Sequence, residues 1–158
     1  MNWHRRKRSK GFSLLELVIV VVIIGIIAAI AIPRMSRGSA GAADAALTGD
    51  LAIMRAAIDL FAAEHDGAFP TAANIESELI QYTDAARDAQ AARDATHIYG
   101  PYLRKVPPLP VGAKKGQTGI AAADGATIGW IYTAATGDIN ANCANGEKDV
   151  SGKQYNAY

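Results

Sequence analysis

The sequence predicts an α+β protein: a long N-terminal helix, half membrane anchor and half amphipathic scaffold, packed on a small C-terminal domain with a short antiparallel β-sheet. Three observations predict this fold. An apolar run extends over residues 12–32, an apolar stripe with helical spacing follows it, and a β-branched, aromatic strand lies at residues 127–133. A chain of 158 residues has room for one ordinary domain and an extension.

Residues 1–11 form a basic leader. They hold five of the 16 Lys and Arg residues and no acid, which leaves 11 basic against 15 acidic residues in the remainder. The basic character therefore belongs to the leader and gives no support for nucleic-acid binding. A basic block before an apolar run is typical of the cytoplasmic side of a membrane anchor.

Residues 12–32 are the predicted transmembrane and assembly helix. A helix of this length spans about 31 Å, close to the hydrocarbon core of about 30 Å. The run is longer than the apolar part of an ordinary signal peptide, although Ala29-Ile30-Ala31 leaves cleavage after Ala31 open. Pro33 follows, and we expect it to kink or locally melt the helix.

Residues 33–66 are the predicted amphipathic half of the same helix. Apolar residues recur there at spacings of three and four, which places them on one helical face. This stripe consists of Leu47, Leu51, Met54, Ile58 and Phe61. His65 is expected at the surface of the helix end, and Gly67 suits the left-handed position that follows a helix.

Residues 67–158 are the predicted α+β head. A turn at residues 69–71 leads into a second helix with Thr71 as its cap, carrying Ile75, Leu79 and Tyr82. Residues 84–96 have little to bury and predict a solvated helix or a connector.

The second half of the head predicts an edge segment and a hairpin. Three prolines make residues 106–110 an extended edge, and residues 112–125 are a loop rich in Gly, Ala and Lys. The strand at residues 127–133 pairs with residues 139–142 as a β-hairpin. The single Cys143 excludes an intrachain disulfide.

The sequence shows no catalytic motif, so we expect a protein that is not an enzyme and requires no cofactor. One oxygen-rich segment could bind calcium, because oxygen ligands at alternate positions followed by further acids suit this hard cation. The candidate ligands are Asp138, Asn140, Asn142, Glu147 and Asp149. The alternative is an Asn/Asp-rich turn whose side chains bond the local backbone.

Glu16 is the one carboxylate in the apolar segment. A carboxylate at the centre of a membrane helix costs about 2.5–3.5 kcal/mol, and less near the interface. If the leader were removed after Gly11, Phe12 would carry a new α-amine. Glu16 of one copy could then meet the amine of the next in a bundle of axially offset helices, offsetting the burial of both charges. The alternative is a snorkelling interfacial acid.

The leader, the segment Lys10-Gly11-Phe12-Ser13-Leu14-Leu15-Glu16-Leu17, the apolar run and Pro33 together resemble the type IV prepilin class. This class includes the pseudopilins of type II secretion systems. The head resembles the major pseudopilin group in its turn at residues 69–71 and in the late strand Gly129-Trp130-Ile131-Tyr132. That group binds calcium in its C-terminal loop, which adds to the case for the segment at Asp138.

The resemblance implies a role for each matching residue. Prepilin peptidase would cut between Gly11 and Phe12, and Phe12 would be N-methylated. Glu16 and Pro33 would act in assembly, the first by neutralising a neighbour's N-terminus and the second by kinking the helix. The implied partners are copies of the chain in a filament, the peptidase and methylase, an inner-membrane assembly platform and minor pilins.

These observations predict a structural subunit of a type IV pilus-like filament, most like a type II secretion pseudopilus. It would be a single-pass inner-membrane protein with a cytoplasmic leader and a periplasmic head. Alternatives within this class are a type IV pilin for adhesion, motility or DNA uptake. An alternative of another class is a membrane-anchored periplasmic binding or sensing module in which Glu16 is incidental.

Overall fold

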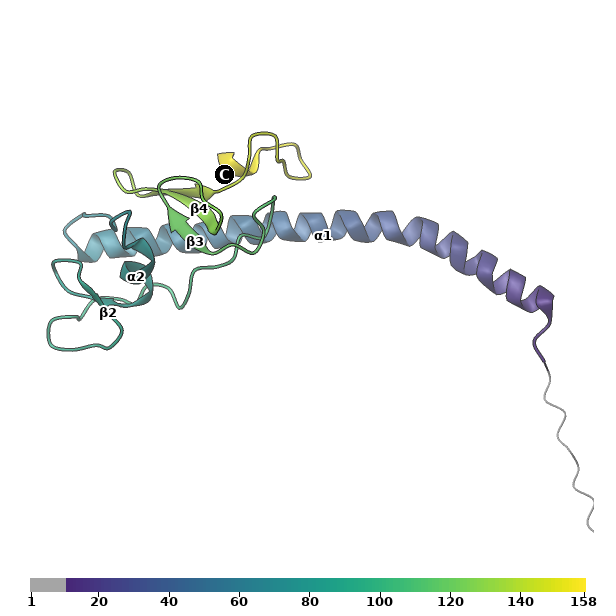
Figure 1. Cartoon of the computed structure of the whole chain (residues 1–158), viewed down its shortest axis with the longest axis horizontal. Coiled ribbons are helices and arrows are strands. Elements are labelled where there is room, and N and C mark those ends of the chain that lie inside the picture. Colours follow the sequence, from purple (N-terminus) through teal and green to yellow (C-terminus); the bar gives the residue numbers. More distant parts are fainter. Residues whose placement is uncertain (1–10) are drawn as a thin grey trace, which may run out of the picture. The chain divides into compact units, whose positions relative to one another are not determined.

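The computed structural model describes residues 11–158, apart from the side chains of residues 33–37. The elements confirm the predicted α+β class with its long N-terminal helix (Figure 1). They are α1 (Leu14–Glu64), α2 (Ile75–Ile80), β1 (Tyr82–Thr83), β2 (Ala89–Gln90), β3 (Gly119–Ala121), β4 (Ile128–Thr133), β5 (Asp138–Ala141) and the 3-10 helix η1 (Tyr155–Ala157). The chain forms two compact units, one ending at Gly38 and one spanning Ser39–Tyr158. The second unit contains the sheets and the core.

The core of the second unit is built on the apolar stripe of α1. Every predicted stripe residue is at most 1% exposed, because the spacing of three and four places all of them on one face. They pack in one cluster with Ile75 and Leu79 of α2 and with Trp130, Tyr132 and Ile139 of the later sheet. The stripe is thus a packing surface of its own domain.

The predicted hairpin is confirmed as β4 and β5. The two strands are antiparallel, with Trp130 opposite Ala141 and Tyr132 opposite Ile139. Gly137 ends the connecting turn at φ +75°, and a Cβ at this position would collide with the ring of Phe69. A glycine is therefore required here both by the backbone and by the close approach of an aromatic ring.

The loop predicted at residues 112–125 is partly wrong, because it contains β3. This short strand pairs parallel with β4, so the sheet is mixed in the order β3-β4-β5. The backbone N–H of Ile120 donates to a carboxylate oxygen of Glu76 at 2.8 Å, which holds the outer edge of the strand. With one buried apolar side chain in three residues, β3 carries no alternation that a sequence pattern could reveal.

The second predicted helix exists but is shorter than expected. α2 buries Ile75 and Leu79 as predicted, whereas Tyr82 belongs to β1. The predicted capping role of Thr71 is wrong, since Asn74 precedes the helix. Thr71 instead donates its backbone N–H (2.9 Å) and its hydroxyl (2.5 Å) to the carboxylate of Glu78, which is 1% exposed. Thr71 therefore supplies hydrogen-bond donors to a buried carboxylate instead of capping the helix.

Residues 84–96 do not form the helix that was one of the two predictions; apart from β2 they are irregular and mostly exposed. β2 lies within this segment and pairs antiparallel with β1, Thr83 opposite Ala89. Thr83 also forms an isolated antiparallel bridge with Tyr99, so three chain segments meet at this residue. Helix propensity was overridden here by the backbone pairing of β2 with β1, which precedes it in the chain.

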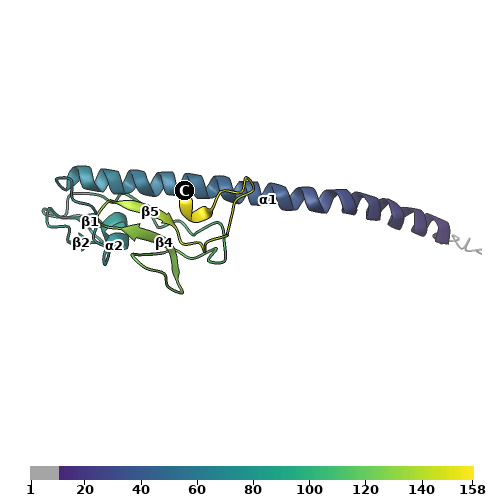
Figure 2. The ribbon, with the colours of Figure 1, turned by 90° about the horizontal axis from the view of Figure 1, so that it is seen from above.

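The C-terminal residues lie beside α1 (Figure 2), and two charged side chains of this helix, Arg55 and Asp44, fix them there. Arg55 donates to the carbonyl oxygens of Ile139 (3.0 Å) and Tyr158 (2.7 Å). Asp44, which is 8% exposed, accepts the hydroxyl of Tyr155 at 2.8 Å and the backbone N–H of Val150 at 3.0 Å. The last residues therefore cover the start of the amphipathic stripe.

Replacing Asp44 tests this fixation. Asp44→Ala is expected to lower the free energy of unfolding by about 1–3 kcal/mol, because it removes the buried charged acceptor of two hydrogen bonds. Amide hydrogen exchange over residues 148–158 and thermal unfolding measure the effect. Asp59→Ala, at an exposed acid of the same helix, is the matched control and is expected to change neither. Unchanged protection in the Asp44 variant would contradict the prediction.

Candidate functional site

The start of α1 is defined by two reciprocal hydrogen bonds. The Ser13 hydroxyl accepts the backbone N–H of Leu15 at 3.3 Å, and Glu16 Oε2 accepts the backbone N–H of Ser13 at 2.9 Å. The carbonyl of Ser13 accepts the N–H of Leu17, which makes Ser13 the N-cap. Glu16 is the third helical residue, where a carboxylate also interacts favourably with the helix dipole.

The first turns of α1 expose an almost purely apolar surface. Leu14–Ile32 has a mean hydropathy of 3.2 and is long and apolar enough to cross a membrane, by length and composition. Its large side chains are about half exposed or more, and Phe12 just before it is 84% exposed. Each such side chain gains about 1.5–3 kcal/mol when it leaves water. This surface therefore has to be covered by lipid or by protein.

The predicted calcium ligands lie on β5 and in the segment after it, and each has a partner within the chain. Asp138 accepts the Thr136 hydroxyl at 2.5 Å, and Asn140 accepts a bond from Arg55 at 3.3 Å. The amide of Asn142 donates to Asp124 at 2.9 Å and to the carbonyl of Ile128 at 2.8 Å.

The two remaining predicted ligands bind nearby backbone. Glu147 accepts the N–H groups of Ala113 (2.6 Å) and Ala144 (2.8 Å), and Asp149 accepts those of Ser151 and Lys153. No group of three or more His, Cys, Asp or Glu side chains suited to a metal forms among the residues whose side chains are described. The calcium site stays a prediction, and thermal unfolding with added Ca²⁺ against a chelator tests it.

The comparison with protein-family models identifies the N-terminal segment. The prokaryotic N-terminal methylation motif matches residues 6–32, which include the predicted cleavage bond, Glu16 and the apolar run. This match supports a type IV prepilin-like N-terminal segment in this chain. Neither the comparison with curated proteins nor that with solved structures returned a match.

The predicted processing bond lies outside α1. Gly11 and Phe12 precede the helix and are exposed. The backbone at Pro33 is helical, whereas the side chain of this residue lies outside the described part. The roles assigned to Gly11, Phe12, Glu16 and Pro33 stay predictions.

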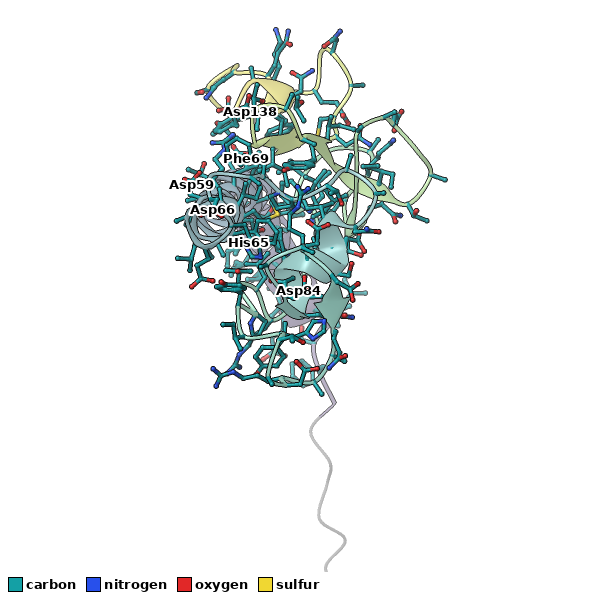
Figure 3. All side chains as sticks on the ribbon, turned by 90° about the vertical axis from the view of Figure 1, so that its left-hand side faces the viewer. Asp59, His65, Asp66, Phe69, Asp84 and Asp138 are labelled. Carbon is teal, nitrogen blue, oxygen red and sulfur yellow. The ribbon has the colours of Figure 1, made fainter. Side chains whose placement is uncertain are left out.

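His65 is not a surface residue as predicted, because the residue is 5% exposed. Figure 3 labels it beside Asp66. The ring stacks on Phe61 at a centroid distance of 4.0 Å. Its Nδ1 lies 2.9 Å from the carbonyl of Phe61, and its Nε2 lies 3.1 Å from the carbonyl of Asp84. The histidine thus joins the end of α1 to the segment after β1.

His97 is a second buried histidine, and it forms a polar cluster with two more exposed acids that lie on either side of β2. Its Nδ1 lies 3.0 Å from Asp94 Oδ1, and its Nε2 lies 3.6 Å from Asp88 Oδ2. Backbone N–H groups of His97 and Thr96 also donate to Asp94, which lowers the pKa of that carboxyl. The hydrogen bond to Asp94 raises the pKa of His97, against the opposing effect of burial.

A raised pKa makes this cluster pH-dependent. Protonated His97 stabilises the fold fully below the pKa of an unfolded histidine, about 6.5, and this stabilisation is lost as the pH rises through the higher folded-state pKa. An NMR titration of the imidazole is expected to give a pKa above about 6.5. Asp94→Asn is expected to lower it, and Asp59→Asn to leave it unchanged. Titration at or below the unfolded value would refute the assignment.

Two features of the chain were missed in the sequence. The Ser13–Glu16 pair carries a readable signal, because Ser-x-x-Glu before an apolar run is the pattern of a capping box. No sequence pattern indicated a role for Asp124. It lies in a Gly/Ala-rich loop, yet it pairs with Lys114 and accepts a hydrogen bond from the Asn142 amide.

Burial raises the pKa of Cys143 to about 11, with a further contribution from Glu147, so its thiol is a buried packing group.

Proposed function

We propose that this chain is a structural subunit of a type IV pilus-like filament, of the type II secretion pseudopilus kind. Prepilin peptidase would cut it between Gly11 and Phe12, and the mature chain would polymerise through its N-terminal helix. The observation that carries this proposal is the methylation motif in front of an exposed apolar helix. The class of structural subunits that carries this motif is generally non-enzymatic.

The apolar surface of α1 has two environments in this proposal. Before assembly the bilayer covers it, and after assembly parallel helices of other subunits cover it. Because both environments are apolar, the transfer loses little hydrophobic free energy. The membrane therefore stores subunits whose assembly surface is already formed, and extraction by an assembly platform is the step that requires energy.

Glu16 supplies the register of the filament. The carboxylate of one copy pairs with the α-amine at Phe12 of the next, so a copy in the wrong axial position leaves two charges unpaired in an apolar bundle. Removing one partner of a buried pair costs about 3–5 kcal/mol. Partners of this assembly are further copies of the chain, the peptidase and methylase, and minor pilins.

The proposed orientation places the leader in the cytoplasm and Ser39–Tyr158 outside the inner membrane. Residues 1–11 carry five Lys or Arg residues and no acid beside the membrane-length segment. Such segments stay on the cytoplasmic side. This orientation presents the Gly11–Phe12 bond at the cytoplasmic face, where the peptidase would act.

The mature N-terminus tests the proposal. Mass spectrometry of the chain purified from membranes that contain the peptidase is expected to give a first residue Phe12 bearing one added methyl group. In a host without the peptidase, residues 1–11 are expected to remain. A mature chain that keeps residues 1–11 in the presence of the peptidase, or one that starts at Ile32, would contradict the assignment.

A further inference from the structure

One ring nitrogen of His97 has no hydrogen-bond partner among the described residues. The residue is 8% exposed, and its Nε2 is fully buried. Buried polar atoms in folded proteins are almost always paired, so an unpaired one calls for an explanation. The group that faces this nitrogen is the carboxylate of Asp88, whose Oδ2 lies 3.6 Å away. This separation is longer than that of a hydrogen bond.

The other ring nitrogen determines where neutral His97 carries its proton. Nδ1 lies 3.0 Å from Asp94 Oδ1. The pKa of this carboxyl is lowered, so the group is ionised at neutral pH and can only accept a hydrogen bond. The neutral imidazole therefore holds its proton on Nδ1 and presents an electron pair at Nε2. A carboxylate on the opposite nitrogen is the usual way in which a metal-binding histidine is oriented.

We propose that His97 Nε2 and the carboxylate of Asp88 bind a zinc ion between them. Zinc lies about 2.0–2.1 Å from imidazole nitrogen and about 2.0–2.2 Å from carboxylate oxygen, so two ligands of a tetrahedron are about 3.3–3.5 Å apart. The separation of 3.6 Å between Nε2 and Oδ2 is close to this spacing. The site lies in the head and does not depend on the proposed function.

The zinc site has two protein ligands and an open side. No group of three or more His, Cys, Asp or Glu side chains suited to a metal forms in the described part of the chain, so water completes the tetrahedron. Access comes from the side of Asp88, whose side chain is 81% exposed, whereas that of His97 is 10% exposed. A small outward rotation of the carboxylate therefore admits the ion.

Both ligands stand on backbone that is already fixed. Asp94 Oδ1 accepts the backbone N–H groups of His97 at 2.7 Å and of Thr96 at 2.8 Å. Asp84 Oδ1 accepts the backbone N–H of Asp88 at 2.8 Å. The three acids also interact favourably with a positive charge on the imidazole. A cation thus binds here without first ordering the segment, which lowers the entropic cost of binding.

Isothermal titration calorimetry with zinc chloride tests the site on the full chain in detergent micelles, above the pKa of His97. Every chain carries His4→Ala, because this histidine of the leader could bind zinc by itself. One ion per chain is expected. Asp88→Asn is expected to weaken binding at least about tenfold, and His97→Gln to abolish it. Asp59→Asn, at an exposed acid of α1, is the matched control and is expected to bind like its parent.

Nitrogen NMR of the imidazole tests the role of Asp94 as a positioning residue. In the neutral ring, Nε2 is expected to resonate as an unprotonated nitrogen, and zinc is expected to shift this resonance while Nδ1 keeps its proton. Asp94→Asn is expected to move part of the proton to Nε2 and to weaken zinc binding about tenfold. Circular dichroism of the same samples checks that each variant is folded.

Each outcome of these measurements supports or contradicts the zinc site. A parent chain that takes up no zinc contradicts it, and so does equal affinity in the parent, Asp88→Asn and His97→Gln, which would place the ion elsewhere. A neutral His97 that carries its proton on Nε2 overturns the orienting role of Asp94. None of these results concerns the Gly11–Phe12 bond, so the proposed function stands or fails separately.

Discussion

Glu16→Ala is expected to abolish filament assembly while the chain is still inserted and cut. The variant leaves the α-amine of each neighbouring Phe12 without its partner in an apolar bundle, at about 3–5 kcal/mol per contact. Since every subunit makes this contact, the cost recurs along the whole filament. The yield of sheared filaments, compared with the amount of mature chain in the membrane, measures the effect.

Two variants control this experiment. Glu16→Asp keeps the charge on a shorter side chain and is expected to retain part of the assembly. Asp88→Ala removes an acid whose side chain is 81% exposed in the head, and it is expected to assemble like the wild type. Wild-type filament yield from Glu16→Ala would refute the pairing of carboxylate and amine. Cross-links between neighbouring copies near residue 16 are expected in the wild type, whereas a monomeric membrane anchor would give none.

Trp130→Ala is expected to cause the largest loss of stability in the head, about 3–5 kcal/mol. The indole is 0% exposed, lies in the same cluster as the α1 stripe, and donates to the carbonyl of Pro107 at 2.9 Å. Truncation leaves a cavity and an unpaired carbonyl at the same time. Differential scanning calorimetry of the full chain in detergent measures the shift in Tm.

Trp130→Phe separates the cost of the lost hydrogen bond from the cost of the cavity. Phenylalanine keeps most of the apolar volume and loses the N–H donor to Pro107, so its cost is expected to be about 1–3 kcal/mol. Val150→Ala, at a side chain that is 66% exposed, is the control and is expected to stay within about 0.5 kcal/mol of the wild type. A Trp130→Ala variant as stable as the wild type would show that the indole is not part of the core.

The sequence was informative wherever one face of an element is buried. The stripe from Leu47 to Phe61 was predicted because periodic burial leaves a periodic pattern. The strand around Trp130 was predicted from its β-branched and aromatic residues. β3 was not, because its single buried side chain, Ile120, forms no period. Thr71 was wrongly predicted as the cap of α2 because it lies shortly before this helix in the sequence. Its hydroxyl instead donates to the buried Glu78 of the same helix. Such a choice between partners depends on tertiary packing.

The candidate site was predictable where its residues are neighbours in sequence. Gly11, Phe12 and Glu16 lie within one short motif, and the roles that the resemblance to type IV prepilins implies for them stay predictions. The contacts of the predicted calcium ligands involve residues far apart in sequence, such as Asn142 with Asp124 and Asn140 with Arg55. No local pattern encodes those distances. His65 was placed at the surface for the same reason, because its partner Asp84 lies 19 residues away.

The attachment of the last residues to Arg55 and Asp44 has a consequence for the timing of synthesis. α1 leaves the ribosome first, and its partners Ile139, Val150 and Tyr155 leave last. At about 5–20 residues per second, the stripe that ends at Phe61 waits several seconds for Ile139 to be made. During that interval the nascent chain exposes an apolar helix face with no partner. The period of greatest aggregation risk therefore falls before the final strand emerges, and a slow codon upstream of it would lengthen that risk.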